Sequence, residues 1–182
     1  MKSLIITWTG FQDQEVVYPY YRLREEADKP TDVVVMSDVL GKFHGILGVN
    51  MDSSALTEEL KDPARVAYYL DGFDMLVIPG GVKALEKLRQ EKHVLAFISE
   101  WNKKGKVIAS TCHGAQLLIS AKVVKGRKVS AYYSIEDDVN NAGAQYVNEP
   151  FVVDGNLVSS PHYQWMGEWM KEAIRVCRSY AA

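Results

Sequence analysis

One of the two cysteines lies where a predicted strand meets a predicted helix. Cys112 follows the apolar run 107–109, which is typical of a buried strand, and precedes Gly114 and the apolar residues of a helix start. Doubly wound α/β proteins place ligands at such corners, beyond the carboxyl ends of their strands. A helix N-terminus also lowers the pKa of a thiol. We therefore expect Cys112 to be a nucleophile with a lowered pKa.

Histidines are the next candidates for chemistry. His113 directly follows Cys112, but adjacent residues on a sharp turn point apart, so we expect its imidazole to support the site without touching the sulfur. His162 begins a later predicted helix near the site; it is either a solvated helix cap or a substitute base. His44 and His93 stand alone, and no spacing among the four histidines is typical of a metal site, so no metal is predicted.

A second corner carries two glycines. Gly80 and Gly81 end the apolar run 75–79, and glycines there allow backbone N–H groups to approach an oxyanion closely. A simple tight turn explains the pair equally well. No Gly-x-Gly-x-x-Gly loop follows a predicted strand, so no nucleotide or other cofactor is predicted.

Elements that alternate along the chain must position these groups. The predicted strands are 4–8, 32–37, 75–79, 106–110 and 128–132, and the predicted helices are 13–27, 63–70, 84–104, 113–123, 135–142 and 161–180. This alternation indicates a mainly parallel sheet covered on both faces. Asp154-Gly155 predicts a late, small β-hairpin. Pro19 is expected to kink or split the first helix.

Length, charge and cysteine count limit the class of protein. A chain of 182 residues fits a single domain, residues 1–182, with one core. The formal net charge of -2 is not typical of nucleic-acid or anionic-membrane binding, and no apolar run approaches the ~20 residues of a membrane span. The N-terminal apolar stretch is short for a signal peptide, and two distant cysteines indicate reduced thiols. We expect a cytoplasmic protein without nucleic-acid or membrane partners.

Several motifs occur together in the order typical of one family. They are "DQEVVYPYYRLREE", "VIPGG", "ASTCHGAQLLISAKVVKGRKVSAYYSIEDDVNNAGAQYV" and "VVDGNLVSS". Over nearly the whole chain these segments resemble the PfpI-type branch of the ThiJ/PfpI superfamily, which has a class I glutamine amidotransferase-like fold. The resemblance implies a flavodoxin-like three-layer α/β/α sandwich with a nucleophile elbow. It also implies a homodimer or a larger homo-oligomer.

The resemblance assigns roles to individual residues. Cys112 matches the family nucleophile, and the backbone N–H of His113, with one from the Gly80-Gly81 corner, would form the oxyanion pocket. Tyr132 matches a tyrosine that lines the site. Glu86 is the nearest match to an acidic residue at the subunit contact, where it would lie near the partner's site.

One position departs from the family pattern. The family places a glutamate that hydrogen-bonds the sulfur seven residues before the helix-one proline, and counting back from Pro19 gives Gln12. Glu15 lies a turn further along and is assigned to another family position. An amide donates a hydrogen bond to sulfur but does not accept and return a proton. The sequence therefore predicts a site without its carboxylate.

Three hypotheses about function follow. The leading one is a cysteine-nucleophile lyase or hydrolase that acts on small reactive carbonyl compounds, by glyoxalase III-type hydration of methylglyoxal or a related deglycase activity. The second is an isonitrile hydratase-type or other hydrolase or hydro-lyase acting on a small electrophile. The third, favoured by Gln12, is a redox-sensing or binding protein that retains the thiol but not the turnover.

Overall fold

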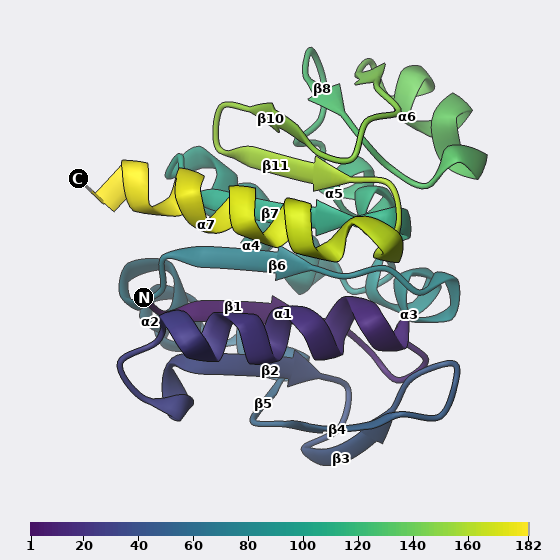
Figure 1. Ribbon diagram of the computed structural model, residues 1–182. Coiled ribbons are helices and arrows are strands. Elements are labelled where there is room, and N and C mark those ends of the chain that lie inside the picture. Colours follow the sequence, from purple (N-terminus) through teal and green to yellow (C-terminus); the bar gives the residue numbers. More distant parts are fainter. Residues whose placement is uncertain (182) are drawn as a thin grey trace.

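A computed structural model describes residues 1–181 and has a seven-stranded sheet at its centre (Figure 1). The sheet has the order β10-β11-β7-β6-β1-β2-β5, and every neighbouring pair is parallel except the β10–β11 hairpin. The strands are β1 (Ser3–Ile6), β2 (Val33–Ser37), β5 (Ala55–Leu56), β6 (Met75–Ile78), β7 (Val107–Thr111), β10 (Val152–Asp154) and β11 (Leu157–Ser160). The central strands are continuous apolar runs because both faces of the sheet are covered.

Helices pack on both faces of this sheet. Figure 1 shows α1 and α7 side by side across one face, with α4 behind the sheet. The helices are α1 (Asp13–Glu26), α2 (Pro63–Gly72), α3 (Val82–Leu88), α4 (Lys92–Lys103), α5 (Ala115–Ser120), α6 (Glu136–Asn141) and α7 (Met166–Ala181). The three-layer α/β/α sandwich with a mainly parallel sheet, expected from the sequence, is confirmed. None of the described helices is long and apolar enough to cross a membrane.

Some elements differ from those predicted. The predicted helix 84–104 is two helices, because Glu91 takes an extended conformation between α3 and α4. Pro19 does not split α1, which is continuous. The antiparallel hairpin of β3 (Gly41–His44) and β4 (Asn50–Ser53) was not predicted. The predicted strand 128–132 is only β8 (Lys128–Val129), which pairs with β9 (Gln145–Tyr146) outside the central sheet.

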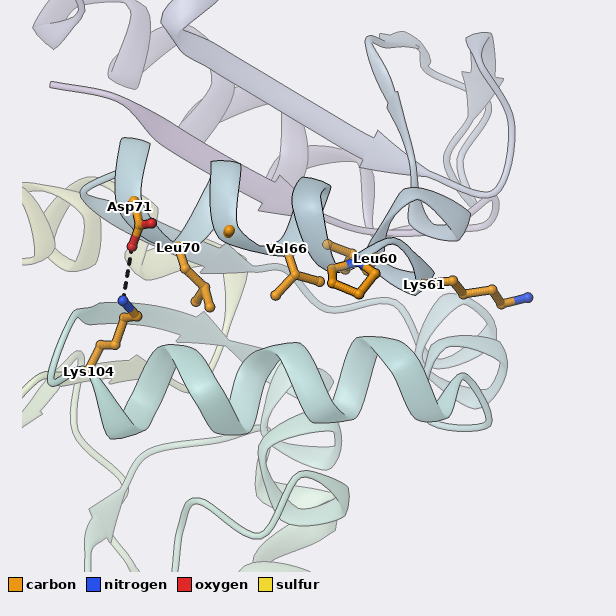
Figure 2. A pocket seen from close by; sticks show the side chains of 8 residues that line it. Leu60, Lys61, Val66, Leu70, Asp71 and Lys104 are labelled. Carbon is orange, nitrogen blue, oxygen red and sulfur yellow. Dashed lines mark hydrogen bonds and ion pairs between the residues drawn. The ribbon is translucent and has the colours of Figure 1, made fainter.

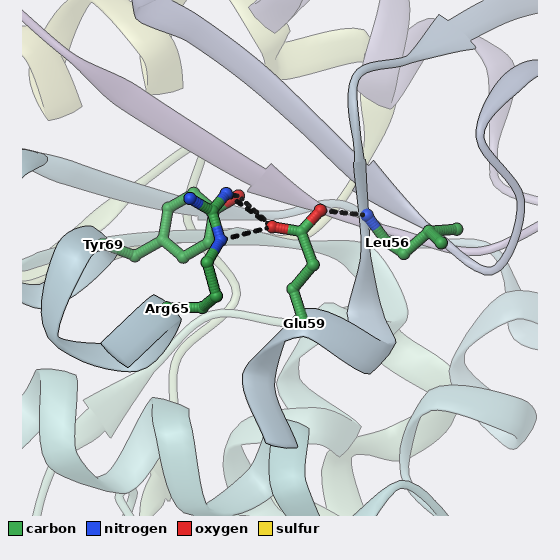
Figure 3. A network of polar contacts seen from close by, with 4 residues as sticks. All are labelled: Leu56, Glu59, Arg65 and Tyr69. Carbon is green, nitrogen blue, oxygen red and sulfur yellow. Dashed lines mark hydrogen bonds and ion pairs between the residues drawn. The ribbon is translucent and has the colours of Figure 1, made fainter. Parts of the chain in front are cut away.

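A carboxylate holds the β5 edge of the sheet in place. Glu59 lies in the 3-10 helix η2 (Thr57–Lys61), and its side chain accepts hydrogen bonds from the Leu56 N–H at 3.1 Å, the Arg65 Nε at 2.8 Å and the Tyr69 hydroxyl at 3.0 Å (Figure 3). These contacts join β5, η2 and α2. The short outer strand is therefore supported by polar contacts as well as by its pairing with β2.

Candidate active site

Cys112 stands at a strained turn between β7 and α5. Its φ of 56° lies in the left-handed region, which costs a residue with a side chain roughly 1–3 kcal/mol. Gly114, two residues later, packs so closely on β6 that an added Cβ would lie 2.5 Å from the Ile78 carbonyl oxygen. The turn therefore has the sharp strand-to-helix geometry expected of a nucleophile elbow, and Cys112 is 7% exposed.

The carboxyl group at the sulfur belongs to Glu15. This side chain is 0% exposed, accepts a hydrogen bond from the Gly80 N–H at 2.7 Å and lies beside Cys112. A Cβ at Gly80 would lie 2.3 Å from the Glu15 Oε2 and 2.8 Å from the Cys112 Cβ, so only glycine leaves room for the two side chains to meet. The prediction of a site without its carboxylate is wrong.

Helix geometry explains this correction. Glu15, Pro19 and Leu23 are spaced four residues apart, and all three lie on the buried face of α1. Gln12 is the residue before the helix, and its backbone N–H donates to the Gly80 carbonyl at 3.2 Å. Its side chain lines the cavity at Cys112, but none of the hydrogen bonds found within residues 1–181 joins that side chain to the sulfur.

Glu15 and Cys112 affect each other's pKa values. Burial raises the pKa of the Glu15 carboxyl to about 7, outweighing the lowering by the Gly80 hydrogen bond and by the neighbouring Cys112. Burial, followed by the negative charge of Glu15, raises the pKa of the Cys112 thiol, so the expected lowering is not observed. When Glu15 is protonated, the charge that opposes the thiolate is absent, and the acid O–H can donate to sulfur. The protonation state of Glu15 therefore affects how readily Cys112 forms a thiolate.

His113 approaches the sulfur more closely than expected. Its Nδ1 lies 3.4 Å from the Cys112 Sγ, at a turn where Cys112 has a left-handed backbone conformation. The imidazole packs on Tyr132 with 4.9 Å between ring centroids. Burial lowers the pKa of His113, which favours a neutral ring that can accept a proton. The prediction that this imidazole avoids the sulfur is wrong.

These groups open into a cavity of about 310 Å³. Its lining comes from six separate segments of the chain: Gln12, Ile46, Gly81, Val82, Cys112, His113, Tyr132, His162 and Tyr163. The turn that carries Ile46 is held in place by Asp13, whose carboxylate accepts from the Leu47 and Val49 N–H groups, each at 2.8 Å. The cavity has the size and the mixed lining of a small-molecule site.

Most of the predicted site residues meet in this cavity, and two do not line it. The N–H of Gly80 is bonded to Glu15 and is not available to an oxyanion, so only Gly81 remains for that role. Glu86 lies exposed on α3, outside the lining. His162 caps a 3-10 helix, where its Nδ1 accepts from the Gln164 N–H at 3.3 Å, and it also lines the cavity.

Sequence reasoning missed several groups in or beside the cavity. Ile46 lies in the hairpin turn that was not predicted, and Val82 and Tyr163 carried no motif of their own. Glu15 did carry a signal, because a glutamate on the apolar face of an amphipathic helix is unusual and points to a special role.

The model of the DJ-1/PfpI family matches residues 1–176. The chain belongs to the DJ-1/PfpI family. Deglycase TK1284 of Thermococcus kodakarensis is 41% identical over 178 residues, which cover 98% of this chain and all of the relative. Deglycase PfpI of Pyrococcus furiosus is 38% identical with the same coverage, and protein/nucleic acid deglycase 2 of Escherichia coli is 31% identical over 96% of each chain.

Solved structures agree with the fold of this DJ-1/PfpI protein. A ThiJ/PfpI domain protein from Brachyspira murdochii superposes with a TM-score of 0.85, covering 98% of this chain and 96% of its own, at 20% sequence identity. Schizosaccharomyces pombe DJ-1 superposes with a TM-score of 0.80 at 17% identity, covering all of both chains. These similarities concern the fold alone.

A second cavity of this DJ-1/PfpI protein, between α2 and α4, has no cysteine in its lining. It has a volume of about 360 Å³, and its lining includes Leu60, Val66 and Leu70 (Figure 2). At one end, the Lys104 Nζ lies 2.9 Å from an Asp71 carboxylate oxygen. None of its lining residues is shared with the cavity at Cys112.

Another cluster has the composition of a metal site. Glu58, Glu91 and His93 offer ligand atoms within 4.8 Å of one another and form the only such group among the residues described. The Lys61 ammonium donates to Glu58 at 2.6 Å, so a cation of the chain itself already lies there. This cluster contributes nothing to the lining at Cys112.

Proposed function

We propose that this DJ-1/PfpI protein is a cysteine-dependent enzyme acting on reactive carbonyl compounds, either as a deglycase or by glyoxalase III-type conversion of methylglyoxal to lactate. The observation that carries the proposal is the buried Glu15 carboxyl group beside Cys112, at a strained elbow that borders an open cavity. The names of the three deglycase relatives support the same chemistry.

In the first step the Cys112 sulfur attacks the aldehyde carbon, and its proton goes to the Glu15 carboxylate. One S–C bond forms, and the carbonyl π electrons move to oxygen. His113 and Gly81 both line the cavity, which supports a role for their backbone N–H groups in stabilising the oxyanion. The oxyanion then takes this proton from the Glu15 carboxyl group, which gives a neutral hemithioacetal and returns Glu15 to its ionised form.

In the second step a proton moves between neighbouring carbons. Glu15 has one carboxyl oxygen, Oε1, that is buried and without a hydrogen-bond partner in the protein. In its ionised form this carboxylate takes the proton of the hemithioacetal carbon, which gives an enediol, and returns it to the adjacent carbon. The resulting lactoyl thioester of Cys112 reacts with water to release lactate and restore the thiol. A carboxyl with a pKa of about 7 is suited to both directions of this transfer.

The alternatives have lost the feature that favoured them. Isonitrile-type hydration and redox sensing without turnover both drew support from an amide in place of a carboxylate at the sulfur. Glu15 provides that carboxylate. No other observation described above favours either alternative over the carbonyl chemistry.

Lactate formation from methylglyoxal tests the proposal. We expect turnover by the wild type and a loss of at least 100-fold in Cys112→Ser and in Glu15→Gln, because general acid–base groups contribute about 10²–10⁴-fold. Cys177→Ser is the matched control, since Cys177 is buried in α7 with its sulfur 3.7 Å from the Asp74 carbonyl oxygen. A wild type that neither forms lactate nor releases the amine from a methylglyoxal–amine adduct would overturn the proposal.

A further inference from the structure

A buried carboxylate holds the turn between β3 and β4 against the start of α1. Asp13, the first residue of α1, is 2% exposed, and its two oxygens accept hydrogen bonds from the Leu47 and Val49 N–H groups, each at 2.8 Å. Gly45 lies directly against this carboxyl group, because a Cβ added there would come within 2.5 Å of the Asp13 Cγ. Both oxygens of Asp13 are therefore used to hold turn 45–49.

The same turn contributes to the cavity at Cys112. Ile46 is among the lining residues and is also 50% exposed, so it lies at the rim, where the cavity meets the solvent. Its backbone N–H donates to the Phe11 carbonyl at 2.8 Å, and the neighbouring Leu47 N–H is one of the two that Asp13 accepts. The position of this part of the cavity wall therefore depends on the start of α1.

A stretch of five residues, 11–15, supports both the rim and the reacting group. Phe11 and Asp13 hold the turn that carries Ile46, whereas Glu15 lies beside Cys112. The two carboxyl groups, two residues apart in the chain, thus have different contacts. Glu15 meets the sulfur, and Asp13 meets only the turn among the hydrogen bonds found within residues 1–181.

We propose that Asp13 is a positioning residue that sets the width of the active-site cavity. By fixing turn 45–49 it holds Ile46 at the rim, where this side chain limits the size of the electrophile that reaches Cys112. Asp13 is not among the residues that line the cavity, so it acts through Ile46. The inference rests on the proposed function in taking this cavity as the place of reaction.

Alkylation of Cys112 by iodoacetamide and by its N-phenyl derivative, iodoacetanilide, tests this role without requiring turnover. The two reagents share a reacting group and differ in size. We expect Asp13→Ala to raise the ratio of the iodoacetanilide rate to the iodoacetamide rate by about tenfold, the lower end of the selectivity that one methylene group supplies in an apolar pocket. Asp13→Asn keeps one acceptor oxygen and should raise the ratio less. Glu59→Gln alters a carboxylate that binds a backbone N–H outside this cavity, and should leave the ratio unchanged.

A double variant separates positioning from a general loss of stability. Ile46→Ala should raise the ratio by itself, and Asp13→Ala combined with Ile46→Ala should raise it no further, because two changes that act through one side chain are not additive. Gly45→Ala displaces the turn in a second way, since its Cβ would collide with the Asp13 carboxyl group. It should raise the ratio as Asp13→Ala does, and it provides the test if Asp13→Ala does not fold.

Three results would overturn the role of Asp13. The first is a ratio that stays at the wild-type value in folded Asp13→Ala or Gly45→Ala. The second is an additive effect in the double variant. The third is an equal change in the rates of both reagents, which would mean that Asp13 acts on the thiol itself. A wild type that forms lactate while the ratio does not respond to these variants refutes only this inference. A wild type that lacks turnover while the ratio responds as expected refutes only the proposed function.

Discussion

Replacing Glu15 by glutamine tests whether burial keeps a proton on this carboxyl group. The side chain is fully buried, and its pKa is raised from 4.5 to about 7, with burial as the largest cause. Glutamine has nearly the same shape and its amide oxygen can still accept from the Gly80 N–H, but it cannot ionise. The variant therefore removes the titration and keeps the packing.

The sign of the effect follows from proton linkage. The folded protein binds this proton more tightly than the unfolded chain, so unfolding releases it between pH 4.5 and about 7. The contribution to stability is complete below pH 4.5 and is lost as the pH rises through about 7. Raising a pKa from 4.5 to about 7 corresponds to a loss of about 3 kcal/mol over this range.

Urea unfolding at about pH 5 and about pH 8 measures this loss. The free energy of unfolding of the wild type should fall by about 3 kcal/mol more than that of Glu15→Gln between the two conditions. Cys112→Ala should retain most of the fall, because burial and not the sulfur is the main cause. Glu25→Gln is the matched control, an exposed glutamate on the same helix, and should behave as the wild type.

An equal change in the free energy of unfolding between about pH 5 and about pH 8 for the wild type and Glu15→Gln would refute this reasoning. It would mean that Glu15 ionises in the folded protein as readily as in the unfolded chain.

Three further predictions concern other parts of the chain. Iodoacetamide should alkylate Cys112 before Cys177 at neutral pH. Cys112 lines the cavity of about 310 Å³ and has the His113 imidazole 3.4 Å from its sulfur to accept the proton, whereas the Cys177 sulfur lies 3.7 Å from the Asp74 carbonyl oxygen. Equal labelling in peptide mass spectrometry would contradict this. Glu59→Gln should lower the free energy of unfolding by about 1 kcal/mol, because its ion pair is partly exposed, and should leave Cys112 alkylation unchanged. We expect the wild type to sediment as a dimer or larger assembly. Leu47 is an exposed apolar residue of a turn, and Leu47→Asp should sediment as a smaller species. A monomeric wild type would disprove the assembly.

The sequence alone determined the features that depend on local patterns. The apolar run before Cys112 is typical of a buried strand, and the small and apolar residues after it are typical of a helix start. Together they predict the strand-to-helix corner. The Asp154-Gly155 turn predicts the β10–β11 hairpin in the same way, and Gly155 has the positive φ such a turn needs. The parallel sheet follows from the alternation of strands and helices, which leaves few other arrangements.

Only the tertiary structure decided which side chains meet at the sulfur. Counting along α1 identified Gln12, but the face that packs on the sheet brings Glu15 to Cys112, and packing between distant segments sets that face. His113 contacts the sulfur at a turn where Cys112 has a left-handed φ. The spacing of residues in the sequence does not reveal this contact. The pKa of about 7 at Glu15 comes from burial, a property of the whole surrounding fold that no local sequence pattern contains.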